Sequence, residues 1–385
     1  MRLFLYIILA LLPLHVMAKS TLATANADNE QQLLKLLDSY IDKRNTYSEI
    51  KEEKIKKLKL KLRTADNNTS RLSLLNTIYH EYYTYSYDSA MVYANRGLAL
   101  AQSVNNAYYT TLNRINRAAV LSTGGFYSQA ETLLNEIGEN NVPHQLKQYY
   151  YYTTTWLYSY WEAFCDKSEF KDYYRQKKLQ FLRLTVNTTH SNYVGLYAYL
   201  SGELAYLENP LGKNVLRHYT IAINNSPVNS RVHASAAYCI ARYYREIGNM
   251  QLYEKYIIEA AISDMVCPLK ENLALQELST YLYKKDTKYA DRAARYIYCS
   301  MEDAKFYNNR LRMLEISSIL PIIATANQEA LAHKERIVRG VLAVVSFLSL
   351  VLFAMAIFGY KQNKWLVTSR REVKSQNRQL TKLNE

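Results

Sequence analysis

Glycine and proline are scarce in this sequence, with 10 and 6 residues respectively in a chain of 385. All-β folds and nucleotide-binding folds need many glycine turns, so this scarcity argues against both and favours helices. The chain also has no phosphate-binding loop, no Gly-x-Gly-x-x-Gly and no His-Glu-x-x-His sequence, which are common marks of nucleotide-dependent enzymes and zinc hydrolases. We therefore expect an all-α protein that is not an enzyme and uses no cofactor.

Cysteine is sparse too, and the four cysteines show no Cys-x-x-Cys spacing. Single buried thiols are a simpler interpretation than a metal cluster or a disulfide framework. The seven histidines are scattered along the chain. His80, beside Glu81, could belong to a small acid–base site, but a hydrogen-bonded structural histidine explains it better. The sequence thus predicts no catalytic and no metal-binding residue.

Positive charge is in excess, with a formal net charge of +14. One basic stretch, residues 51–63, could face an anionic partner or a lipid surface, although a solvated helix face is the simpler explanation. Because this stretch follows an apparent export signal, we expect that this chain itself binds no nucleic acid.

Two apolar segments set the predicted topology. Residues 1–18 combine Arg2 with an apolar core over Leu3–Leu14 and small residues up to Ala18, as in a cleavable signal peptide. Residues 340–360 are uncharged over about 21 positions, which at ~1.5 Å each reach roughly 31 Å, close to the hydrocarbon thickness of a bilayer. We therefore predict one transmembrane helix over residues 340–360.

Charged and aromatic residues flank this second segment, as they flank membrane spans. The predicted flanking residues are Arg336, Arg339, Tyr360, Lys361 and Trp365. After the segment, seven lysines and arginines stand against two glutamates, so the positive-inside rule places residues 361–385 in the cytoplasm. Together with the signal peptide, this predicts a single-pass protein of the bacterial inner membrane whose N-terminus is periplasmic.

The region between the apolar segments has the pattern of stacked helices. Residues 30–64 read as one long helix, and residues 68–320 read as two-helix units that recur every ~35–45 residues. The 37 tyrosines suit such thin stacks, because each has a large apolar ring and one polar tip. The expected pairs are Arg71–Tyr83 with Asp88–Ser103, Ala107–Leu121 with Gln129–Ile137, His144–Phe164 with Phe170–Leu184, Asn192–Leu207 with Leu216–Asn224, Arg231–Glu246 with Leu252–Ser263, and Leu269–Tyr283 with Tyr289–Lys305.

The turn at Gly124–Tyr127, followed by Ala130, has a spacing that resembles the tetratricopeptide repeat. The predicted fold is therefore a tetratricopeptide-like solenoid, an architecture that binds peptides, proteins or other extended ligands in its groove. Pro321 is expected to start a helix, since proline is tolerated in the first turn, and residues 322–339 would then connect the array to the membrane.

Aromatic residues crowd the segment 149–164 more than any other part of the chain. A helix that is apolar on two faces suits the inside of a stack, so burial is one interpretation. The alternative is a stripe that faces a ligand, where tyrosine and tryptophan could stack on a sugar or anchor a peptide. The candidate residues for binding a periplasmic protein or peptide ligand are Tyr150, Trp156, Tyr158 and Trp161.

The tail after the predicted membrane helix has weak heptad spacing. Its candidate seam consists of Leu366, Val373, Leu380 and Leu383, which extends over fewer than three heptads. This spacing predicts a short coiled coil over residues 361–385 through which two copies of the chain would pair. A stalk of this kind needs an attached domain, so we expect the sequence to be part of a longer gene product.

Several segments resemble one known family. They are LLDSYIDKRNTYSEIKEEKIKKLK, YDSAMVYANRGLALA, ENLALQEL and RAARYIYCSMEDAKFYNNRLRMLEISSILPII. The chain is similar over most of residues 30–385 to membrane-anchored regulators of Bacteroides-type bacteria. The resemblance implies tetratricopeptide-like repeats in the periplasm, one membrane helix, a cytoplasmic coiled coil and a helix-turn-helix-like DNA-binding output. No such output is present in this sequence, and the resemblance implies no catalytic residue.

The leading hypothesis is a signal sensor whose periplasmic repeats bind a ligand or partner and whose membrane helix passes the signal to a cytoplasmic output, such as transcription regulation. A structural adaptor that gathers envelope proteins is one alternative. A truncated sensor histidine kinase is another, because periplasmic repeats, one span and a polar coiled coil also precede kinase cores.

Overall fold

The computed structural model describes residues 30–270 and 273–383, so the predicted signal peptide at residues 1–18 lies outside the described residues. The described part is helical throughout, as predicted, and the chain divides into two units, Met1–Ile323 and Ala324–Glu385. The α-helices are α2 (Glu30–Asp42), α3 (Arg44–Arg63), α4 (Asn68–Tyr83), α5 (Tyr87–Ser103), α6 (Ala107–Thr123), α7 (Tyr127–Ile137), α8 (Lys147–Phe164), α9 (Lys171–Thr188), α10 (Val194–Glu208), α11 (Lys213–Asn224), α12 (Arg231–Glu246), α13 (Met250–Val266), α14 (Ala274–Lys285), α15 (Ala290–Tyr307) and α16 (Arg310–Leu383). Short 3₁₀ turns occupy Glu139–Asn141, His144–Leu146 and Thr287–Tyr289.

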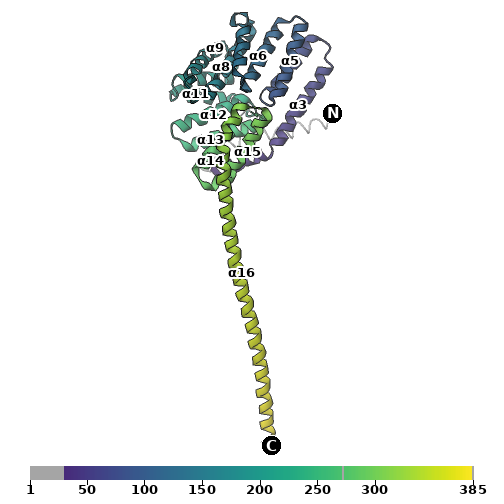
Figure 1. Ribbon diagram of the computed structural model, residues 1–385, viewed down its shortest axis with the longest axis vertical. Helices are drawn as coiled ribbons and strands as arrows, with labels where there is room; N and C mark the ends of the chain where they lie inside the picture. The colour runs from purple at the N-terminus through teal and green to yellow at the C-terminus, as the bar shows by residue number, and fades with distance from the viewer. Residues whose placement is uncertain (1–29, 271–272, 384–385) are drawn as a thin grey trace. The chain divides into compact units, whose positions relative to one another are not determined.

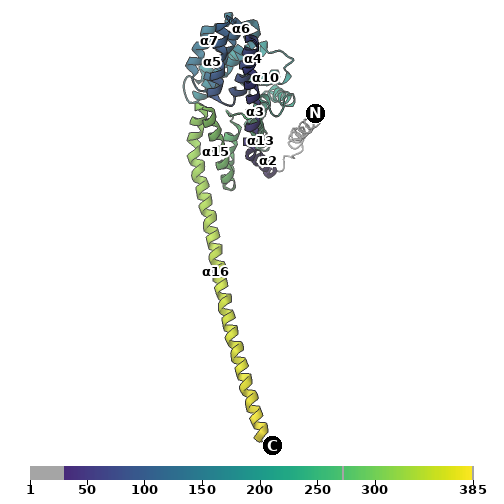
Figure 2. The same cartoon turned by 90° about the vertical axis from the view of Figure 1, so that its right-hand side faces the viewer.

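Helices α4 to α15 pack against one another in sequence order, and Figures 1 and 2 show this stacking from two sides. The pairs are α4 with α5, α6 with α7, α8 with α9, α10 with α11, α12 with α13, and α14 with α15. All six predicted helical pairs are therefore present among the described residues, which confirms the solenoid of the tetratricopeptide type. The largest boundary error is at α14, which begins at Ala274 rather than at Leu269.

Asparagine and serine side chains start several of these helices. Asn67 accepts a hydrogen bond from the backbone N–H of Ser70 at 2.8 Å, and Asn106 accepts one from Tyr109 at 3.0 Å. Ser230 and Asn249 cap α12 and α13 in the same way. These caps satisfy backbone N–H groups that have no partner within the helix, so short polar loops are enough to separate the helices.

Two sequence-based expectations about helix limits are wrong. The long helix expected over residues 30–64 is divided at Lys43, because α2 and α3 bury their apolar residues in different clusters. Pro321 lies inside α16 and does not start a helix. The start of α16 is set earlier, where the Asn309 side chain accepts a hydrogen bond from the backbone N–H of Arg312 at 3.1 Å. Pro321 is exposed and removes only one backbone hydrogen bond from the helix.

The apolar core of the first unit consists of three clusters spaced along the stack. The largest joins α2 with helices from α9 onward, the second joins α3, α4 and α5 with Tyr307 of α15, and the third lies between α6, α7, α8 and α9. Large buried tyrosines such as Tyr79, Tyr219 and Tyr307 contribute to these clusters. Tyr307 joins the start of the array to its end, because its ring lies among residues of α3, α4, α5 and α6.

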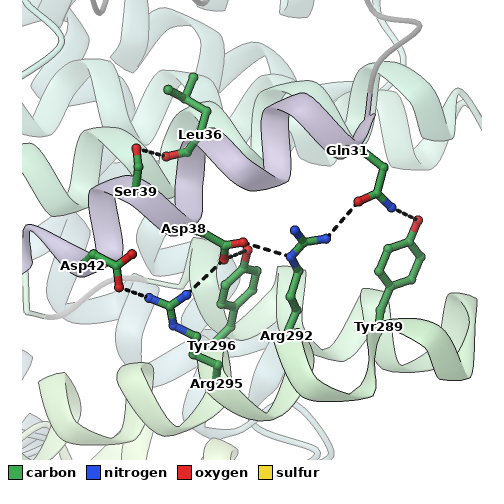
Figure 3. A network of polar contacts seen from close by, with 9 residues as sticks. All are labelled: Gln31, Leu36, Asp38, Ser39, Asp42, Tyr289, Arg292, Arg295 and Tyr296. Carbon is green, nitrogen blue, oxygen red and sulfur yellow. Dashed lines mark hydrogen bonds and ion pairs between the residues drawn. The ribbon is translucent and has the colours of Figure 1, made fainter.

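Helix α2 covers α15 through a network of polar contacts, shown in Figure 3. The Asp38 carboxylate accepts hydrogen bonds from Arg292 at 3.0 Å and from the Tyr296 hydroxyl at 2.8 Å. Arg295 donates to both Asp38 and Asp42. Beneath these contacts α2 buries Leu33, Leu34, Leu37 and Ile41. Helix α2 thus packs against α13 and is tied to α15, so it belongs to the last two pairs of the array.

The second unit is, over its described residues, the continuation of α16 beyond Ile323. Within the described part of the chain, α16 is the one helix long and apolar enough to cross a membrane, with a mean hydropathy of 2.8 over its most apolar window of 18 residues. None of that window is buried by other parts of the chain. Length and composition thus make α16 a candidate membrane span.

If α2 is an integral part of the array, removing its buried side chains must destabilise the first unit. Leu37 is fully buried, so Leu37→Ala should lower the free energy of unfolding by about 2–5 kcal/mol. Urea unfolding followed by far-ultraviolet circular dichroism measures this change. Leu60→Ala, at a position 53% exposed on α3, is the matched control and should cost less than about 0.5 kcal/mol. Equal losses in the two variants would show that α2 does not pack as described.

Candidate functional site

A cleft of about 550 Å³ lies in the first unit, between α8, α9, α10, α12, α14 and the first turns of α16. Pockets for small ligands have volumes of about 300–1,000 Å³, so this cleft is of a suitable size. We call it the groove. Its charged wall residues are Glu162, Asp166, Lys171, Lys178, Glu203, Arg231, Arg242, Asp264, Glu277, Arg312 and Glu315.

One wall of the groove is aromatic because α8 carries Tyr152, Trp156 and Tyr160 at intervals of four residues, which lie on one face of a helix. The Trp156 ring stacks on Tyr199 of α10, with the ring centres 6.2 Å apart and the planes 8° apart. Trp156 Nε1 is buried and has no hydrogen-bond partner among the described residues. The wall therefore offers a flat apolar surface together with one unused donor.

The floor of the groove contains a buried carboxylate, Glu203, on α10. It accepts hydrogen bonds from Arg242 at 2.9 Å, from the Tyr219 hydroxyl at 2.6 Å and from the Cys239 thiol at 3.2 Å. Burial alone would raise the pKa of Glu203, but the charges of Arg242 and Lys178 and the Tyr219 hydrogen bond outweigh it and lower the pKa from the usual 4.5 to about 2. Glu203 is thus ionised at neutral pH and holds α10, α11 and α12 together.

Most other carboxylates of the groove are also paired with a cation. Lys178 donates to Glu162 at 3.3 Å, and both side chains are largely buried. Lys171 pairs with Asp166 at 2.6 Å, and Arg245 pairs with Glu277 at 2.7 Å. Because these charges are satisfied within the protein, the groove as a whole does not strongly repel a ligand of either sign.

Helix α16 contributes two residues to the groove wall. Arg312 is 7% exposed and donates from Nη1 to Glu315 at 2.6 Å, and Gln276 of α14 donates to the same carboxylate at 3.4 Å. Arg312 Nε is buried and has no hydrogen-bond partner among residues 30–270 and 273–383. The helix that contains the candidate membrane span therefore begins as part of the groove.

Of the four aromatic residues selected from the sequence, one lines the groove. Trp156 lines the groove. Tyr150 and Tyr158 are each 4% exposed and lie in the core beside α7. Their hydroxyls donate to the Leu134 carbonyl and to Glu131, so their polar tips are satisfied inside the array. Trp161 stacks on Tyr174 of α9 with the ring centres 4.3 Å apart. The four candidate residues thus lie on different faces of α8, and their part in binding a ligand stays a prediction.

The predicted membrane-flanking residues lie on α16. The Tyr360 and Trp365 side chains are both highly exposed, at 72% and 71%. Arg339 pairs with Glu335 at 2.8 Å, one turn earlier on the same helix. Arg336 and Lys361 are also exposed. These side chains are therefore free of contacts that would prevent them from meeting a membrane surface.

The predicted coiled-coil seam also lies on α16. Leu366, Val373 and Leu380 are 46–59% exposed, and Leu383 is the last residue of the helix. A helical backbone and exposed seam residues are what pairing between two copies would require, and the pairing itself stays a prediction.

Sequence reasoning missed Glu203, Arg242, Arg312 and Glu315. Glu203 had a visible signal, since it is the one carboxylate within the apolar segment 194–207, and such a charge usually has a buried partner. The other three residues carry no local signal, because their roles depend on helices far apart in the sequence.

The lowered pKa of Glu203 makes the stability of the first unit depend on pH. A carboxylate whose folded pKa lies below its unfolded pKa contributes stability that is complete above pH 4.5 and is lost as the pH falls toward about 2. We expect Glu203→Gln to be less stable than the wild type by roughly 3 kcal/mol at pH 7, and this gap should close by about pH 2. Urea unfolding of both chains at several pH values tests this, and a gap independent of pH would contradict it.

Two comparisons with known proteins bear on this arrangement. No curated protein matches the chain. A family model described as the SusR N-terminal TPR domain matches residues 41–318, which is 278 of the 385 residues. The matched region includes all six helical pairs and the first turns of α16, together with every residue that lines the groove. The match supports the resemblance to tetratricopeptide-type regulators, and the chain belongs to the family of the SusR N-terminal TPR domain.

Proposed function

We propose that this chain is a membrane-anchored signal sensor that binds a periplasmic ligand or protein partner in its groove and transmits the bound state through α16. One observation carries the proposal: Arg312 and Glu315 form part of the groove wall, and they belong to the same helix that is long and apolar enough to cross a membrane. A ligand that binds better with these two side chains in one arrangement would favour that arrangement, and the contacts within the first turns of α16 would change accordingly.

The proposed topology places the first unit in the periplasm and residues 361–385 in the cytoplasm of a bacterial inner-membrane protein. The support comes from the seven lysines and arginines after residue 360, opposed by two glutamates. The apolar segment 1–18 has the composition of an export signal and agrees with this orientation.

The proposed output is regulation of transcription, as in the membrane-anchored regulators that this chain resembles. Nucleic acid would be bound by an output region in the cytoplasm, and the part of the chain described here would bind the signal. Two copies would pair through α16, where Leu366, Val373 and Leu380 are exposed at heptad spacing.

We propose binding without catalysis for the groove, because its carboxylates and cations are used in ion pairs with one another.

The test compares groove and tail variants in the native bacterium. Trp156→Ala removes the aromatic wall, and deletion of residues 361–385 removes the cytoplasmic tail. Both should give the transcript profile of a strain that lacks the whole gene, since one cannot bind the signal and the other cannot pass it on. RNA sequencing provides the measurement. A green fluorescent protein fused after Glu385 must also fluoresce, as expected for a cytoplasmic C-terminus.

Tyr173→Ala is the matched control, because Tyr173 is an aromatic residue 53% exposed on α9 and does not line the groove. It should keep the wild-type profile. A wild-type profile in a stable, membrane-inserted Trp156→Ala variant would contradict sensing by the groove. A tail deletion that keeps the wild-type profile would favour the structural adaptor instead.

A further inference from the structure

Arg312 is a buried arginine in the wall of the groove, and its donors are not all used within the described part of the chain. Its side chain is more than nine-tenths buried, and its Nη1 donates to the Glu315 carboxylate at 2.6 Å. Nε has no hydrogen-bond partner among the described residues. A buried donor without a partner destabilises a fold by about 1–3 kcal/mol. A ligand that accepts a hydrogen bond from Arg312 would therefore remove an existing cost in addition to making a new contact.

The turn that carries Arg312 is held in place from outside the groove. Just before it, the Tyr307 hydroxyl lies 2.8 Å from the Tyr83 carbonyl and 2.7 Å from the Thr123 hydroxyl. Arg310 stacks over the Phe126 ring at 4.1 Å. Asn308 joins α15 to α16 in the left-handed conformation, with a φ of 68°. These contacts fix the backbone of the turn, so the Arg312 guanidinium is aimed into the groove before any ligand arrives.

The chemistry of the open edge favours a carboxylate. A guanidinium presents its donors in a planar fork that matches the two oxygens of a carboxylate, and such pairs are stronger than neutral hydrogen bonds. Glu315 already occupies the Nη1 side of Arg312, which shows that this turn accommodates a carboxylate. The Glu315 side chain is 30% exposed and lines the groove beside Arg312, so a ligand carboxylate in the groove would compete with it for the guanidinium.

The aromatic part of the groove lining suits a flat apolar group. Trp156 and Tyr199 lie nearly parallel there, and Trp156 Nε1 is a second buried donor without a partner among the described residues. The carboxylates Glu162 and Glu203 in the same groove are each bonded to a cation, which limits their repulsion of a bound anion.

We propose that the groove binds a ligand with a carboxylate and a flat apolar part, and that Arg312 in the first turn of α16 binds the carboxylate. This inference rests on the proposed sensing function, because it names the ligand chemistry of the same groove. It also identifies how occupancy reaches α16: the ligand competes with Glu315 for Arg312, a contact within the helix that continues toward the membrane.

The test uses benzoate as the probe and benzamide, its uncharged planar analogue, as the reference compound. The full chain is studied in detergent with Trp161→Phe and Trp365→Phe, so that Trp156, in the groove, is the remaining tryptophan of the three. A ligand of this size should bind with a Kd on the order of 1–10 mM. Benzoate should change Trp156 fluorescence in this range, and benzamide should bind at least about tenfold more weakly.

Two variants should shift benzoate binding in opposite directions. Arg312→Gln should weaken it at least about tenfold, because the charged hydrogen bonds are lost. Glu315→Gln should strengthen it about threefold or more, because the competing carboxylate within the protein is gone. Arg183→Gln, which removes an exposed arginine on α9 that pairs with Glu208 outside the groove, should leave binding unchanged. If Arg312→Gln does not fold, Glu315→Gln still tests the proposal, since a merely structural role predicts no tighter binding.

Failure of this inference is distinguishable from failure of the sensing function. No change in Trp156 fluorescence at about 100 mM benzoate, or benzoate binding that neither Arg312→Gln nor Glu315→Gln alters, overturns the assignment of a carboxylate to Arg312. Neither result bears on the transcript profile of Trp156→Ala, which decides the sensing function by itself.

Discussion

The burial of Tyr307 is the interaction on which the rest of the arrangement depends. A solenoid of helical pairs is held together mainly by contacts between neighbours, so its ends are normally independent of each other. Here the Tyr307 ring, at the end of α15, is fully buried in the cluster formed by α3, α4 and α5, and its hydroxyl bonds to Tyr83 and Thr123. The first residues of α16 are thereby held against the turn between α6 and α7. Without this contact, Arg312 and Glu315 would not form a wall of the groove.

The groove follows from how charge is handled in a thin stack of helices. Such a stack has no thick apolar core, so charged residues such as Glu203 and Lys178 end up buried and must find partners on neighbouring helices. Glu203 is satisfied by three donors from α11 and α12, whereas Nε of Arg312 has no partner within the described part of the chain. This difference separates residues that hold the helices together from residues that are available to a ligand. It also places the available residue on the helix that leads to the candidate membrane span.

The sequence predicted the repeating helices well, because turns such as Gly124–Tyr127 and caps such as Asn67 act locally. In the structure a Cβ on Gly124 would lie 2.3 Å from the Tyr87 ring, which explains why a glycine stands there. The candidate site was predicted less well. Helical spacing shows that Trp156 and Tyr158 lie on different faces of α8, but it does not tell which face meets α10 and which meets α7. The break at Lys43 and the position of Arg312 depend on contacts between residues that are far apart in sequence, and no local pattern indicates these.

The most direct test of this account asks whether the start of α16 is seated against the turn between α6 and α7. A Cβ placed on Gly125 would lie 3.6 Å from the Arg310 Cβ, within the Cβ separation of a disulfide, although the φ of 85° at Gly125 strains any side chain placed there. The double variant Gly125→Cys with Arg310→Cys should therefore form a cross-link in native membranes on mild oxidation, detected by mass spectrometry of the peptide that joins positions 125 and 310. Gly125→Cys with Ile322→Cys, about 18 Å further along the helix, should not. Absence of the first cross-link, or equal formation of both, would contradict a seated α16 and with it the proposed route from groove to membrane.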